Sequence, residues 1–83
     1  MPRPRFKAFF DSLDAIESQA VESALRGGDI NRFASDNGAM PEVLAGGINE
    51  KAADIIGDNI FDYDGQKIIF YDEYLPEIEK YFI

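Results

Sequence analysis

The chain has 83 residues, which is enough for one small folded domain and too few for a second core. Sixteen acidic residues against eight basic ones give a formal charge of −8, and the sequence has no histidine, cysteine or tryptophan. These absences exclude a thiol nucleophile, a Ser-His-Asp triad, a Cys/His zinc site and a disulfide framework within these residues. Apolar residues make up 46% of the sequence, which is typical of a folded domain and not of a disordered acidic tail.

The charges are unevenly distributed. Arg3, Arg5 and Lys7 lie in the first seven positions, which hold no acidic residue. The rest of the chain is strongly acidic and should repel phosphate, so we expect neither nucleic acid nor an anionic membrane as a partner. We expect a cytoplasmic location, because the apolar patch after the basic start is too short for a secretory signal. No stretch approaches the roughly 20 apolar residues of a membrane helix.

The first predicted element lies between residues 6 and 26, where apolar side chains recur at steps of three and four. Asp11 and Ser12 interrupt this stripe with side chains that often cap helices. The pattern predicts a short leading turn and then a main helix from about Leu13, which ends at the glycine pair 27–28. We therefore divide the chain into a basic N-terminal arm with a leading turn, residues 1–12, and a single domain, residues 13–83.

Two further helices follow in the sequence. Asp29 can cap a helix that ends near residues 37–38, and Pro41 suits the first turn of a third helix that ends at about Gly57. The pair Gly46 and Gly47 lies inside this third helix, where each glycine costs about 1 kcal/mol relative to alanine. We expect a neighbouring helix packed against the bare backbone to offset that cost, and a kink or irregular turn is the alternative.

The last part of the chain changes pattern. Residues 60–63 and 66–71 are rich in aromatic and β-branched side chains and flank Asp64-Gly65, which predicts a hairpin with a type I′ turn. An EF-hand loop around the same glycine is the alternative, but it would begin at an isoleucine and end at a tyrosine, neither of which is a suitable ligand. Pro76 can open a short final helix.

These elements predict an α+β fold. Three helices form a compact bundle, a two-stranded hairpin covers one side and a short C-terminal helix closes the core. The order is that of a winged helix, a fold that reads DNA with its third helix. That helix would present Glu42, Glu50 and Asp54 with only Lys51 as a cation, so nucleic-acid binding is an alternative that the charge disfavours.

Acidic side chains on the third helix form the candidate metal site. Glu50 and Asp54 are four residues apart and share a helical face, and Asp58 follows four residues later. A hard divalent cation such as Ca²⁺ or Mg²⁺ would relieve the repulsion between these carboxylates, and Asn49 could add an amide oxygen. The alternative is a solvated helix face. No cofactor is otherwise indicated.

The same residues carry a resemblance to a known family. The motif Ile48-Asn49-Glu50 followed by Gly57-Asp58, together with residues 39–42, 64–65 and 74–75, resembles the TerB-C domain over most of residues 13–82. That family lies C-terminal to the TerB module in bacterial proteins of tellurite resistance and stress response. The resemblance implies a C-terminal module of a larger protein and a role in metal binding for acidic residues, which points here to Glu50 and Asp58 with Asn49 beside them. Alternatively, Asn49 and Glu50 brace the hairpin and Asp58 binds backbone N–H groups.

We expect no catalysis, because no serine has a histidine or an obvious lysine base nearby and so small a domain leaves little room for a substrate pocket. The function we predict is a non-catalytic accessory module, which contacts other domains of its parent protein or a separate protein partner. Binding of a divalent cation through Asn49, Glu50, Asp54 and Asp58 is a second hypothesis.

Overall fold

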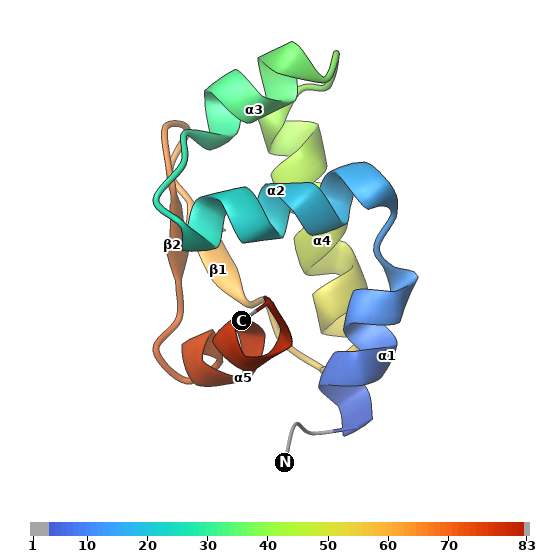
Figure 1. The fold of residues 1–83 in the computed structure, drawn as a ribbon. Helices are drawn as coiled ribbons and strands as arrows, with labels where there is room; N and C mark the ends of the chain where they lie inside the picture. The colour runs from blue at the N-terminus through green and yellow to red at the C-terminus, as the bar shows by residue number, and fades with distance from the viewer. Residues whose placement is uncertain (1–3, 83) are drawn as a thin grey trace.

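The computed structural model describes residues 4–82, and within them the chain forms five helices and one antiparallel hairpin. The elements in chain order are α1 (Pro4–Ser12), α2 (Ala15–Leu25), α3 (Ile30–Asp36), α4 (Pro41–Ile55), β1 (Phe61–Tyr63), β2 (Ile68–Phe70) and α5 (Leu75–Phe82) (Figure 1). The predicted α+β class is confirmed, including the bundle, the hairpin and the closing helix.

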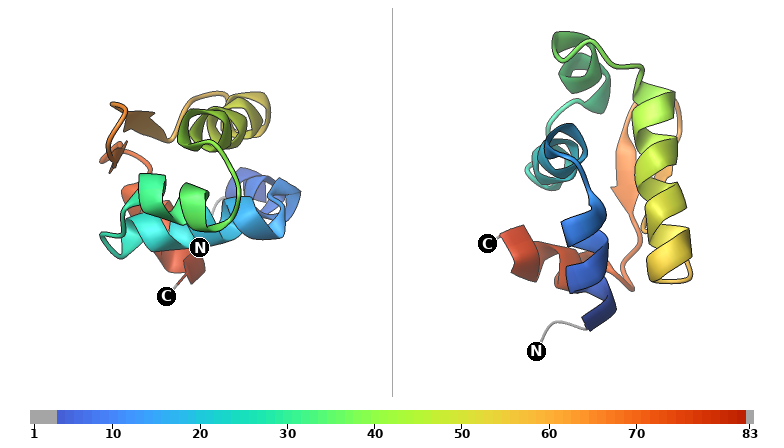
Figure 2. Two further views of the ribbon diagram at one scale, coloured as in Figure 1. Left: turned by 90° about the horizontal axis from the view of Figure 1, so that it is seen from above. Right: turned by 90° about the vertical axis from the view of Figure 1, so that its right-hand side faces the viewer.

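The elements lie in two layers. Helix α4 and the hairpin form one layer, and α1, α2, α3 and α5 form the other (Figure 2). The apolar stripes of both layers meet in one core, whose largest fully buried side chains include Phe6, Phe9, Ile48, Phe61 and Ile78. No helix among residues 4–82 has both the length and the apolar character needed to cross a membrane.

The first predicted helix is two helices in the structure. The chain breaks at residues 13–14, so α1 is a nine-residue helix and not only a leading turn. Asp14 begins α2 as a capping box: its carboxylate accepts the Glu17 backbone N–H, and the Glu17 carboxylate accepts the Asp14 backbone N–H. Four helices, not three, therefore precede the hairpin within the described residues.

Helix α1 belongs to the core. Phe6, Phe9 and Phe10 are all buried, and Phe10 stacks on Tyr81 of α5 with ring centroids 4.1 Å apart. Of the basic residues predicted to form an arm, Arg3 lies outside the described residues, and Lys7 forms an exposed ion pair with Asp11 at 3.1 Å. The described part of the segment 1–12 thus packs with the rest of the domain.

Helix α4 runs without a break through Gly46 and Gly47. A Cβ at position 47 would lie 3.3 Å from Oε2 of Glu17 on α2, which partly agrees with the expected close packing. A Cβ at position 46 would meet nothing within 4 Å. The expectation of a packed neighbour is therefore wrong for Gly46. The alternative, a kink or irregular turn, is not found either, because α4 is one continuous helix over Pro41–Ile55.

The hairpin forms where it was predicted, but its turn differs. Phe61 pairs with Phe70 and Tyr63 with Ile68, which leaves residues 64–67 as a four-residue connection. Only Gly65 in this connection has a positive φ, so the predicted type I′ turn is wrong. Instead, the Asp64 carboxylate accepts the backbone N–H groups of residues 66 and 67, both at 2.9 Å. A side chain thereby supplies the turn's hydrogen bonds.

Candidate functional site

The candidate metal residues lie along one side of α4 and the turn after it. Glu50, Asp54 and Asp58 are exposed, and Asn49 is half-buried. Among residues 4–82, no group of three or more carboxylates is arranged to hold a metal ion. The cation site on these residues therefore stays a prediction.

Asn49 connects α4 to the first strand. Its Nδ2 donates to the carbonyl of Phe61 at 3.0 Å, and its Oδ1 accepts the backbone N–H of Ile60 at 3.0 Å. Ile60 and Phe61 are both buried, so this amide satisfies two backbone groups that water reaches poorly. The bracing role that was weighed as an alternative is confirmed for Asn49.

Asp58 is also engaged. Its Oδ1 accepts the backbone N–H of Asn59 at 2.9 Å, and its Oδ2 accepts the hydroxyl of Tyr74 at 2.8 Å. The first of these contacts is the backbone role that was weighed for Asp58. The second ties the turn after α4 to the start of α5. Of the candidate ligands, Asn49 and Asp58 thus help to hold the fold.

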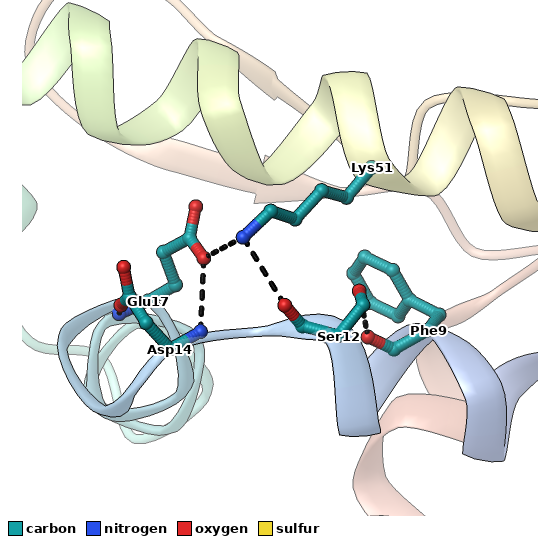
Figure 3. A network of polar contacts seen from close by, with 5 residues as sticks. All are labelled: Phe9, Ser12, Asp14, Glu17 and Lys51. Carbon is teal, nitrogen blue, oxygen red and sulfur yellow. Dashed lines mark hydrogen bonds and ion pairs between the residues drawn. The ribbon is translucent and has the colours of Figure 1, made fainter.

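A polar network at the corner between α1 and α2 was not predicted. Lys51 of α4 reaches across to this corner, where its Nζ donates to Glu17 Oε1 at 2.5 Å and to the Ser12 carbonyl at 3.1 Å (Figure 3). The Glu17 side chain is only 10% exposed. The sequence Asp14-Ala15-Ile16-Glu17 has the capping-box spacing that would have marked Glu17, whereas no sequence signal links it to Lys51.

Beside this network lies an open groove between the start of α2 and the first half of α4. It has a volume of about 520 Å³. We call it the α2–α4 groove, and its lining residues are Asp14, Ile16, Glu17, Gly38, Ala39, Met40, Val43, Leu44 and Gly47. Met40 and Val43 are large apolar side chains that remain 61% and 66% exposed. No sequence signal predicted this groove, because the apolar periodicity of α4 indicates only the stripe that faces the core.

The hairpin carries one more polar link. The Tyr63 hydroxyl donates to Asn31 Oδ1 at 2.6 Å, and Asn31 Nδ2 donates to the Gly65 carbonyl at 3.0 Å. Desolvation raises the pKa of Tyr63, and the nearby carboxylate of Glu42 raises it further. The pKa of Asp64 is lowered, chiefly by the backbone hydrogen bonds from Lys67 and Gln66 that stabilise its charged form.

Comparison with known proteins identifies the family. The model of the TerB-C domain matches residues 2–79. The chain belongs to the TerB-C family. The resemblance noted from the motif Ile48-Asn49-Glu50 and Gly57-Asp58 is thus confirmed, and with it the link to TerB-type proteins and tellurite resistance. No curated protein and no solved structure matches this TerB-C domain.

Proposed function

We propose that this TerB-C domain is a non-catalytic accessory module, which contacts the TerB module of its parent protein or another protein through an acidic surface. The observation that carries the proposal is the charge: sixteen acidic residues stand against eight basic ones. Four of the cations, Lys7, Arg26, Arg32 and Lys51, are already engaged by carboxylates of the same chain. A surface of this kind favours basic protein partners and disfavours polyanions.

The proposal is tested by titrating the ¹⁵N-labelled chain with a purified TerB module added as a separate protein. When two modules belong to one polypeptide, each meets the other at an effective concentration of about the millimolar range. An affinity that is weak between the separate modules would therefore still hold them together in one chain. Residue-specific shifts that saturate below about 1 mM and weaken with added salt support the proposal. A complete absence of shifts over that range excludes the TerB module as the partner and leaves only contact with another protein.

Nucleic acid is the alternative partner to exclude. The outer face of α4 presents Glu42, Glu50 and Asp54 as exposed side chains, and Lys51 is held by Glu17. Binding to a DNA backbone needs free cations, so duplex DNA at low salt should leave the amide signals of residues 41–56 and 64–67 unchanged. Tight, salt-sensitive DNA binding would refute the acidic-surface proposal.

A divalent cation on Glu50, Asp54 and Asp58, with Asn49, is the second part of the proposal. It ranks below the protein contact, because Asn49 and Asp58 already hold other partners. Titration with Ca²⁺, Mg²⁺ and Mn²⁺ decides it. Shifts or broadening confined to residues 49–58 and saturating below millimolar concentration would support a site, whereas uniform weak drift over all acidic residues would reject it.

A further inference from the structure

Helix α4 and its N-cap carry apolar and acidic side chains that stay exposed in the described part of the chain. Among the described residues, only Met40, Val43, Ile69 and Tyr81 are large apolar side chains that are highly exposed. Met40 and Val43 lie one helical turn apart and both line the α2–α4 groove. The groove falls within the range of about 300–1,000 Å³ that is common for binding pockets.

The glycine pair lies on the same face of α4 as Val43, and we call this face the stripe. Positions 43, 46, 47 and 50 follow the three- and four-residue steps of one helical face. Gly46 is exposed, and a Cβ there would touch nothing in the chain within 4 Å. Alanine would favour the helix more and would fit in the folded chain, so internal packing does not explain a glycine at this position. Glycine does allow another backbone to approach closely.

Charges around the stripe indicate the chemistry of whatever covers it. Asp14 is an exposed acidic residue in the lining of the groove, and no described lysine or arginine lines it. Glu17 also lines the groove, but its largely buried carboxylate already pairs with Lys51. Glu42 and Glu50 are exposed on α4 on either side of Gly46. Lys51, the nearest cation on α4, already pairs with Glu17. An occupant should therefore combine small or aliphatic side chains with flanking lysines or arginines.

The shape of the stripe favours a helix as the occupant. Residues 40–50 span about 15 Å along the axis of α4, which matches roughly three turns of a second helix laid beside it. Apolar anchors spaced at three and four residues are the mode by which an amphipathic helix binds in a groove. We propose that the α2–α4 groove, which Met40 and Val43 line and which the exposed Gly46 of α4 adjoins, is the docking site for a basic amphipathic helix of a protein partner. This inference rests on the proposed function and names its surface.

A synthetic peptide tests the inference directly. The probe has about 15 residues, enough for roughly four helical turns, with an alanine and leucine face flanked by lysines. A second peptide of the same composition, scrambled so that its leucines are spread around the helix, is the control. We expect the first peptide to shift the amide signals of residues 40–50, and the scrambled one to bind at least about tenfold more weakly.

Variants of the chain sharpen the test. Val43→Ser should weaken peptide binding about five- to tenfold, because it removes an aliphatic contact that the bound peptide would bury. Val43 is exposed in the free chain, so the substitution should not disturb the fold. Ile69→Ser removes a comparably exposed apolar side chain on β2 and should leave the affinity unchanged. Gly46→Ala should weaken peptide binding, although the variant should fold at least as stably as the unsubstituted chain. If the glycine served only the fold, the substitution would change stability and not peptide binding.

The outcomes separate this inference from the proposed function. Equal binding of both peptides, or shifts centred outside residues 40–50, would overturn the docking site. If the TerB module binds while the amphipathic peptide does not bind the groove, the docking site fails and the proposed function stands. If the peptide binds the groove but the TerB module gives no shifts, the docking site stands and the TerB module is excluded as its partner.

Discussion

Asn49 offers the sharpest test of how the site is built. Replacing it with alanine removes both hydrogen bonds to the first strand and leaves a buried N–H at Ile60 and a buried carbonyl at Phe61 without their partner. Each such loss costs about 1–3 kcal/mol, and because Asn49 is half-buried water can compensate in part, so we expect Asn49→Ala to lower the free energy of unfolding by about 2–4 kcal/mol. A domain of this size has roughly 4–12 kcal/mol in total.

Urea unfolding followed by far-ultraviolet circular dichroism measures this loss, and thermal unfolding should show a fall in Tm of about 10–25 °C. Asn59→Ala is the matched control. The Asn59 side chain is exposed, so its removal should change stability by less than about 0.5 kcal/mol. A loss at Asn49 as small as that of the control would refute the bracing role.

Asn49→Asp distinguishes bracing from metal binding. The aspartate keeps an oxygen that can accept the Ile60 N–H, but it cannot donate to the Phe61 carbonyl. It also places a negative charge beside the oxygen of that carbonyl. We expect a loss of about 1–3 kcal/mol that Ca²⁺ does not restore. If the residue is instead a ligand, the added carboxylate should strengthen cation binding, and a stability that rises with millimolar Ca²⁺ only in this variant would contradict the bracing account.

Three further predictions concern α4 and the hairpin turn. Gly46→Ala should raise the free energy of unfolding by about 0.5–1 kcal/mol, measured by urea unfolding. Gly47→Ala should raise it by less, because the methyl group at position 47 would meet the Glu17 carboxylate. A lower free energy of unfolding for Gly46→Ala would contradict the observation that a methyl group at position 46 has room. Lys51→Met should lower the free energy of unfolding by about 1–3 kcal/mol, because it leaves the largely buried Glu17 carboxylate without its cation. Adding Glu17→Gln should recover part of that loss. An unchanged stability of Lys51→Met would show that water alone stabilises the Glu17 carboxylate. The folded-state pKa of Asp64 is lowered, so its stabilising effect is present above the unfolded pKa of about 3.9 and is lost as pH falls through the lower folded value. The advantage of the parent chain over Asp64→Asn should therefore shrink in unfolding experiments below about pH 4, and a pH-independent difference would contradict this assignment.

Most of the fold could be predicted because local signals and apolar periodicity agree. Asp29 caps α3 as expected, Pro41 stands at the start of α4, and the apolar stripe of α4 faces the core. The break between the first two helices was expected at Asp11 and Ser12 but falls at residues 13–14. The capping box at Asp14 decides its position, since reciprocal hydrogen bonds outweigh the continuity of the apolar stripe.

The functional residues were harder to predict, because their partners are distant in sequence. Asn49 could be a ligand or a brace on spacing alone, and only the return of the chain at Ile60 places backbone groups within its reach. The Lys51–Glu17 ion pair joins residues 34 positions apart. The exposure of Met40 and Val43 likewise depends on how α2 crosses α4, which no local pattern encodes.

The salt dependence of TerB-module binding is the most direct test of the acidic surface as a protein-contact surface. The dissociation constant between the TerB module and the unsubstituted chain is measured at several ionic strengths between about 50 and 500 mM, where the Debye length falls from roughly 14 to 4 Å. If acidic side chains make the contact, this dissociation constant should rise with salt, because salt screens their attraction to the partner. A constant that does not change with salt, or that falls as salt is added, would contradict it.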